Sequence, residues 1–220
     1  MSSIRLYAAE FLGTAILVFF AAGSVMVAAM LGNLPGPLIS GAASGLALMI
    51  LIWALFDISG AHLNPALTLG LAVLGDFPKR LVPGYVAAQL AGSCAGAALL
   101  YYTLGAQGGM GANVPNAGLP LSLTGAFAIE VFLSFIMMLV IRAAFAAEPP
   151  LRLFASVPIG LVVGIEVMLM GPVAGAAMNP ARAFGPTVFL GDWRFYWIYA
   201  LGPMLGILAA SWVWRFLKQR

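Results

Sequence analysis

One pattern occurs twice in this sequence, as Leu63-Asn64-Pro65-Ala66-Leu67 and as Met178-Asn179-Pro180-Ala181-Arg182. Each copy follows a glycine-rich break in a long apolar run. Asn at the N-cap and Pro at the first helical position form a strong helix start. Each helix then has room for about ten residues, or about 15 Å, which is half the thickness of a hydrocarbon core. The pattern therefore predicts two half-helices that enter a membrane from opposite faces and meet near its midplane.

The composition places the whole chain in a membrane. Of its 220 residues, 63% are hydrophobic and 8% are charged, against about 25% charged in soluble proteins. The apolar runs lack the two-residue alternation of outer-membrane strands, so we expect an all-α integral membrane protein. The single Cys94 and single His62 exclude a disulfide and a Cys/His metal cluster. We expect no metal, no cofactor and no nucleic-acid partner.

Six apolar runs have spanning length, and their order repeats. Glu10 and Glu130 lie at like places in the first and fourth runs, and the pairs Gly41/Gly45 and Gly160/Gly164 in the second and fifth. Three spans per half require opposite insertion of the halves, which is an inverted repeat with broken helices at mid-membrane. We expect one domain over residues 1–220: a first repeat at about 4–104, a connecting loop at about 105–122 and a second repeat at about 123–217. The spans are expected at about 4–31, 38–56, 81–104, 123–146, 153–170 and 193–217.

The basic residues predict the orientation. Besides Arg182 in the second half-helix, one side of the six-span arrangement holds only Arg194. Because cytoplasmic loops carry the excess of Lys and Arg, both termini are expected in the cytoplasm, with the protein in the plasma (inner) membrane. The residues on the basic side are Arg5, Lys79, Arg80, Arg142, Arg152, Arg215, Lys218 and Arg220.

Residues 59–68 and 175–186 closely resemble the two signature loops of the aquaporin (major intrinsic protein) family. Residues 8–14 and 83–89 are similar to its first and third helices, so the resemblance covers essentially the whole chain. It implies six transmembrane helices, two re-entrant half-helices and a homotetramer with one pore per subunit. Water and small neutral solutes are then expected to pass through the pore, and membrane lipid is expected to surround the protein. The short termini are typical of prokaryotic members.

The repeated motif suits a pore that excludes ions and protons. An N-cap Asn uses its side-chain oxygen on the helix, which leaves its NH₂ donors free to face the pore. Each half-helix presents about +0.5 charge at its N-terminus, so two such ends repel cations. A water held by both Asn donors cannot readily accept a proton along the file. The motif residues are Asn64, Pro65, Ala66, Asn179, Pro180 and Ala181.

Arg182 matches the family's constriction arginine, and the motif spacing of the family places its three companions at Ser44, Val167 and Ala176. An arginine in a membrane is costly unless it lines a wet path. The companions are small, which predicts an opening wide enough for glycerol, urea or neutral metalloid hydroxides. Two observations leave the width open: Ala183 replaces the Asp that usually follows this Arg in glycerol channels, and Phe19 or Phe20 would fill the space if turned inward.

Four further polar residues are candidates for a role. In the family, the counterparts of Glu10 and Glu130 accept hydrogen bonds from the re-entrant backbone, and the counterpart of His62 packs near the cytoplasmic pore. We therefore expect these three residues to support the loops. Glu166 lies mid-span, about 100° around the helix from Val167. Two roles remain possible for Glu166. It is either a functional carboxylate or a structural group that is hydrogen-bonded or protonated.

Three classes of membrane protein compete. A passive channel accounts for the duplicated motif. A secondary transporter of inverted-repeat type for a small solute is the alternative, with Glu166 as its one candidate for ion or proton coupling. A structural or adhesive tetramer with a closed pore is the third. An enzyme is not expected, because the sequence offers no nucleophile–base pair, metal cluster or phosphate loop.

Overall fold

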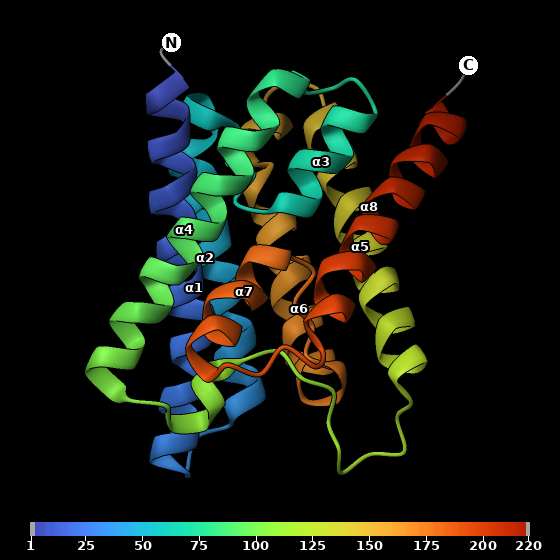
Figure 1. The fold of residues 1–220 in the computed structure, drawn as a ribbon. Helices are drawn as coiled ribbons and strands as arrows, with labels where there is room; N and C mark the ends of the chain where they lie inside the picture. Colours follow the sequence, from blue (N-terminus) through green and yellow to red (C-terminus); the bar gives the residue numbers. More distant parts are fainter. Residues whose placement is uncertain (1–2, 219–220) are drawn as a thin grey trace.

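The structure is a computed structural model that describes residues 3–218, so Arg220 of the predicted basic side lies outside the described residues. Six long helices run side by side (Figure 1). Two short helices, α3 (Pro65–Val73) and α7 (Pro180–Leu190), lie between them, α3 in the half that carries both termini and α7 in the other half. The predicted fold class is confirmed. The long helices are α1 (Ser3–Leu31), α2 (Gly36–Ser59), α4 (Val82–Leu104), α5 (Leu123–Ala146), α6 (Ser156–Ala174) and α8 (Tyr196–Lys218), and single 3₁₀ turns are η1 (Lys79–Leu81), η2 (Gln107–Gly111) and η3 (Leu151–Phe154).

All six long helices have membrane-spanning length. Five of them are also apolar enough to be identified as spans by composition alone, with η3 and α6 counted as one segment. The sixth, α4, has 23 residues, but buried polar and small residues such as Gln89, Ser93 and Gly92 lower its mean hydropathy. These side chains are turned inward, so the lower hydropathy of α4 reflects contacts within the protein.

The helix packing repeats between the halves. Helix α1 packs along α4, α5 packs along α8, and α2 packs along α6 across the two halves. At the α2–α6 crossing a Cβ atom on Gly45 would lie 2.5 Å from the carbonyl oxygen of Gly160, and one on Gly160 would lie 2.6 Å from that of Gly45. Only glycine permits this backbone approach, which brings the two pore-lining helices together.

The two broken spans end in the same way, at a glycine. Gly60 follows α2 with φ +83°, and Gly175 follows α6 with φ +102°. We expected the second break to begin at Gly171, but α6 continues through Pro172 to Ala174. The helical bond from Gly175 N–H to the oxygen of Gly171 is still formed at 3.1 Å, because a proline removes only its own N–H from the helix.

Candidate functional site: the pore and its two re-entrant loops

The half-helices begin at asparagine caps of equal geometry. Asn64 Oδ1 accepts from the N–H of Ala66 at 2.9 Å and of Leu67 at 3.4 Å. Asn179 Oδ1 accepts from Ala181 at 2.9 Å and from Arg182 at 3.4 Å. In both caps the side-chain oxygen therefore satisfies helix N–H groups that would otherwise be unpaired in the middle of the membrane.

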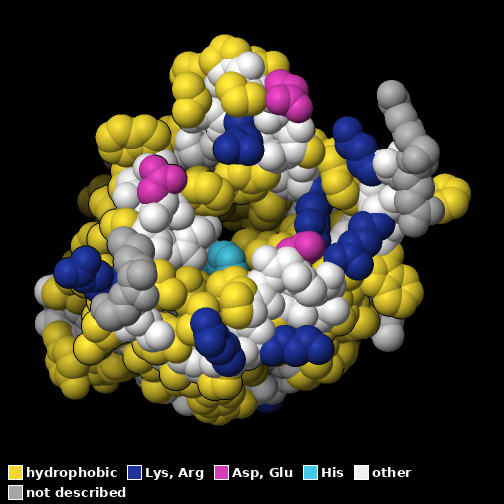
Figure 2. Space-filling model, turned by 90° about the horizontal axis from the view of Figure 1, so that it is seen from above, with side chains coloured by type: hydrophobic (Ala, Val, Ile, Leu, Met, Phe, Trp, Pro, Cys, Tyr) yellow, Lys and Arg dark blue, Asp and Glu magenta, His cyan; other side chains and the backbone are white. Residues whose placement is uncertain are grey.

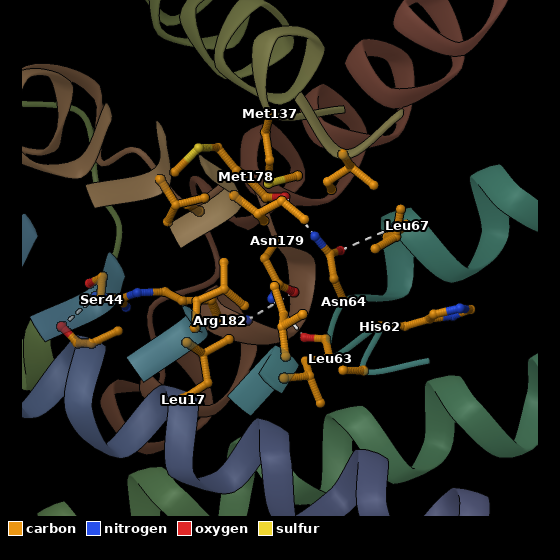
Figure 3. Close-up of a pocket in the computed structure, with 18 of the residues that line it drawn as sticks. Leu17, Ser44, His62, Leu63, Asn64, Leu67, Met137, Met178, Asn179 and Arg182 are labelled. Atoms are coloured by element: carbon orange, nitrogen blue, oxygen red, sulfur yellow. Dashed lines mark hydrogen bonds between the residues drawn. The ribbon is translucent and has the colours of Figure 1, made fainter. Parts of the chain in front are cut away.

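The NH₂ groups of the two caps join the loops to each other. Asn64 Nδ2 donates to the carbonyl oxygen of Met178 at 2.9 Å, and Asn179 Nδ2 donates to that of Leu63 at 2.8 Å. Figure 3 shows the two asparagines side by side at the centre of the cavity. We expected both N–H groups of each asparagine to be free, and this is wrong for one of them. The other N–H of each asparagine remains available to the pore.

The loops before the caps hold a strained backbone in the same register. Ala61 and Leu63 have φ of 47° and 50°, and Ala176 and Met178 have φ of 46° and 52°. Left-handed conformations in residues with a side chain cost about 1–3 kcal/mol each, and they persist only where surrounding contacts impose them. Buried carboxylates supply those contacts in both halves.

In the first half the carboxylate is Glu10, fully buried on α1. Its Oε1 accepts from His62 N at 3.0 Å and from the Ser59 hydroxyl at 2.7 Å, and its Oε2 accepts from Leu63 N at 2.7 Å and Gln89 Nε2 at 2.8 Å. Four donors therefore fix this carboxylate against the loop and against α4.

His62 is held beside this network. Its Nδ1 lies 3.0 Å from Thr68 Oγ1, which also accepts from Gln89 Nε2 at 2.9 Å. The imidazole ring packs against Phe77 and Tyr85. It also lines the pore cavity, toward the end that carries the termini.

In the second half the carboxylate is Glu130, fully buried on α5. Its Oε1 accepts from Ala177 N at 2.8 Å and its Oε2 from Met178 N at 2.9 Å. No side chain among residues 3–218 donates to it within hydrogen-bonding distance. Tyr199 instead fixes the end of α6, because its hydroxyl donates to the oxygen of Ala174 at 2.7 Å.

Arg182 points from α7 across the pore and is held by main-chain oxygens. Its Nη1 donates to Gly111 O at 2.8 Å and its Nη2 to Ala21 O at 3.2 Å. A guanidinium has five N–H donors, so three remain for a solute. The arginine is therefore fixed in direction while part of its donor set stays available.

The central loop supplies one of these oxygens, a role that no pattern in the sequence predicted. Met110 is fully buried and packs with α1 and α4. Asn113 Nδ2 donates to Gly175 O at 2.7 Å, and Asn116 Nδ2 donates to Pro172 O at 2.8 Å. The loop thus ties α1, α6 and α7 together around Arg182. Its signal in the sequence is the glycine-rich run Gly108 to Gly111, in which every residue has a positive φ.

A narrow cavity of about 80 Å³ connects the sites described above, which is room for several water molecules. Ser44, Val167, Ala176 and Arg182 all line it at one end, and His62 lines it at the other. Figure 3 shows the same order, with Arg182 and Ser44 on one side of the asparagines and His62 on the other.

The space beside the constriction is not filled by either phenylalanine considered above. Phe19 packs in the apolar cluster between α1 and α4, and Phe20 is 48% exposed on the outer surface of α1. Leu17 and Ala21 are the α1 residues that line the cavity. Neither phenylalanine therefore covers Ser44, Val167 or Ala176.

The cavity widens beyond both ends. On the side away from the termini, a second cavity of about 630 Å³ shares Val167, Ala176 and Arg182 with the narrow one. On the other side, Figure 2 shows a central hollow with the one histidine at its edge, on a face over which Lys and Arg side chains are spread together with some acidic ones. There Asp76 binds Arg142 at 2.6 Å and so ties the turn after α3 to α5. A helical membrane protein with a narrow path between two wider mouths has the form of a channel.

Comparisons with known proteins also indicate a membrane channel. Residues 1–214 match the sequence profile of the family described as Major intrinsic protein. Aquaporin NIP3-1 from Zea mays is 39% identical over 221 residues, which cover 100% of this chain and 72% of that protein. Probable aquaporin AqpM from Archaeoglobus fulgidus is 35% identical over 247 residues, covering 100% of this chain and 99% of that protein. The X-ray structure of the aquaglyceroporin from Plasmodium falciparum superposes with a TM-score of 0.86 at 26% identity, over 97% of this chain and 96% of that chain.

The chain therefore belongs to the major intrinsic protein family. It is an integral membrane channel for water and small solutes.

Proposed function

We propose that this channel conducts glycerol, urea or neutral metalloid hydroxides as well as water, and excludes ions and protons. The observation that carries the proposal is the set of side chains opposite Arg182: Ser44, Val167 and Ala176 line the cavity there, and none is larger than valine. An uncharged solute with hydroxyl or amide oxygens accepts from the free N–H donors of Arg182, while its carbon atoms contact Val167 and Ala176.

Ion and proton exclusion follows from charges fixed in the wall. The N-termini of α3 and α7 meet at Asn64 and Asn179, and each presents about half a positive charge to the pore. Arg182 adds a full positive charge in the constriction. The free N–H of each asparagine donates to a passing oxygen, which orients a central water so that it cannot relay a proton.

Stopped-flow light scattering on proteoliposomes tests the proposal. With an impermeant osmolyte, vesicles with the channel are expected to shrink faster than empty vesicles, and with glycerol or urea they are expected to re-swell faster. Ser44→Phe narrows the constriction and should abolish re-swelling while water flow remains. Leu46→Phe, on the same helix but 55% exposed on the outer surface, is the matched control and should behave as wild type. Fast water flow without solute entry in the wild type would refute the wide constriction.

We further propose a homotetramer with one pore per subunit. Large apolar side chains on the outer faces of α2 and α6, such as Trp53 and Leu161, are 75% and 54% exposed. A face of this kind is suited both to lipid and to neighbouring subunits. The mass of the protein in detergent, measured by light scattering with the detergent contribution subtracted, is expected to be four times that of one chain. A monomeric mass would exclude the tetramer.

We also propose that both termini face the cytoplasm in the plasma membrane, and that residues 4–104 and 123–217 form the two repeats of one domain, joined by residues 105–122. The Lys and Arg side chains on the face shown in Figure 2 support the orientation, because positive residues favour the cytoplasmic side. The pairing of α1 with α4 and of α5 with α8 supports the duplication. Protease access to a C-terminal tag in spheroplasts and in inverted vesicles tests the orientation.

A further inference from the structure

The strongest anomaly in the protein is Glu166, in the middle of α6. Its side chain is 5% exposed, and neither Oε1 nor Oε2 has a hydrogen-bond partner among residues 3–218. The other two membrane carboxylates, Glu10 and Glu130, accept four and two hydrogen bonds. Glu166 is therefore the one buried carboxyl group in the described chain that supports no loop.

Apolar side chains surround Glu166 along its own helix. Val162 and Met170, one turn to either side, pack into the cluster formed by α5, α6 and the second re-entrant loop. In the first repeat, the alignment of Gly45 with Gly164 places Ala47 at the corresponding position. The carboxyl group is thus an addition of the second half and does not belong to the shared architecture.

Helix α5, which packs against α6, brings one buried carboxyl group, Glu130, close enough for its charge to act on Glu166. The other elements packed around α6 bring few titratable groups. Asp57 lies near the end of α2 and Arg152 lies in η3, both at the face that carries the termini. Tyr199 of α8 and Arg182 of α7 act on Glu130. No cation among the described residues forms an ion pair with Glu166.

These surroundings suit a neutral carboxylic acid and not a carboxylate. A buried carboxylate without hydrogen-bond donors loses its hydration and gains nothing in return. A second negative charge beside Glu130 would also repel the first. We propose that Glu166 is a proton-binding site in the channel wall, and that release of its proton displaces the second re-entrant loop and closes the channel to water and solutes.

The coupling between Glu166 and the pore runs through Glu130. The two oxygens of Glu130 hold the N–H groups of Ala177 and Met178, between Ala176 of the constriction and the Asn179 cap. A negative charge on Glu166 pushes the Glu130 carboxylate away and so loosens these two bonds. The loop then loses the contacts that hold Ala176 and Met178 in their left-handed conformations. The resulting pH dependence has one sign: the channel is open at acidic and neutral pH and closes as the pH rises.

The test is water permeability of proteoliposomes with equal pH on both sides, measured from acidic to alkaline pH. Wild type is expected to lose most of its permeability on the alkaline side, whereas Glu166→Gln, which keeps a neutral group of the same shape, should retain it throughout. Glu148→Gln removes an exposed loop carboxylate and should behave as wild type. A flat wild-type profile, or an alkaline loss that persists in Glu166→Gln, overturns the proposal.

A second measurement does not depend on flux. Infrared difference spectra of wild type minus Glu166→Gln at neutral pH should show the C=O stretch of a protonated carboxylic acid, and the band should vanish at alkaline pH. Absence of the band at neutral pH overturns the proposal even if the vesicles conduct nothing. If Glu166→Gln does not fold, Glu166→Met replaces it in both measurements. The pH profile uses water alone, so a failure of the proposed solute selectivity leaves this result unaffected.

Discussion

The two re-entrant loops have the same backbone and different support. Gly60 and Gly175 end the preceding helices, the left-handed residues follow in the same register, and an Asn-Pro pair starts each half-helix. The first loop is anchored by side chains: Glu10 accepts four hydrogen bonds, two of them from Ser59 and Gln89. The second loop is anchored by Glu130 through backbone N–H groups alone.

The difference shows where each half uses its polar residues. Positions that hold His62, Leu67 and Thr68 in the first half hold Ala177, Arg182 and Ala183 in the second. In the first half, the polar side chains therefore hold that half's own loop in place. The second half directs the cation of Arg182 into the pore, and the central loop supports this half from outside through Gly111 and Asn113.

The largest expected effect comes from removing the carboxylates. Glu10→Leu leaves four donors without an acceptor and Glu130→Leu leaves two, at a cost of about 1–3 kcal/mol for each buried donor. The melting temperature in detergent is thus expected to fall in both variants and to fall further in Glu10→Leu. Glu148→Leu, on an exposed loop, is the control and should melt as wild type. Equal losses in the two variants would mean that the side-chain donors of the first half add nothing.

The next effect tests the pore. Arg182→Ala removes the charge and the donors of the constriction, and a barrier lower by about 1.4 kcal/mol raises the flux of a solute about tenfold. Glycerol or urea flux is expected to increase and a proton gradient to decay faster, as measured with a vesicle-trapped pH dye. Leu67→Ala changes the corresponding position of the first half, which also lines the cavity, and should leave proton exclusion intact. Proton leakage in Leu67→Ala would show that exclusion does not depend on the second half alone.

A smaller effect is expected where the halves are alike. Gly45→Ala and Gly160→Ala each place a methyl group against the other glycine's carbonyl oxygen, which costs about 1–3 kcal/mol. The two variants should lower the melting temperature equally. Gly171→Ala is the matched control on α6, because its added carbon meets its nearest neighbour at an ordinary 3.8 Å. Unequal losses would show that the α2–α6 contact is not symmetric.

The smallest effect is expected when one residue is exchanged between the halves. Thr68→Ala gives the first half the residue of the second and removes the bonds to His62 and Gln89, a loss of about 1 kcal/mol. Its melting temperature should fall only slightly, with water permeability unchanged. Ala183→Thr makes the reverse exchange and buries a hydroxyl, so it is expected to destabilise as well. Greater stability in Thr68→Ala would mean that the network around Thr68 is strained.

The sequence predicts the parts that local chemistry determines. Helix breaks, asparagine caps and inward insertion all follow from Gly, Asn-Pro and apolar length, and the structure shows them within a few residues. The role of the central loop is not predictable in this way. Arg182 binds the main-chain oxygen of Gly111, and because every residue has such an oxygen, the sequence does not indicate which one is used. The bonds from the asparagines to Leu63 and Met178 are hidden for the same reason.

Those two reciprocal bonds have a consequence for how the protein is made. Each asparagine completes the loop of the other half, so neither half holds a finished pore lining by itself. The halves insert in opposite directions, and a chain with one half reversed would leave both amide groups and both carbonyl oxygens unpaired in hydrocarbon. These four polar atoms therefore have their partners only when the two halves are inserted in opposite directions.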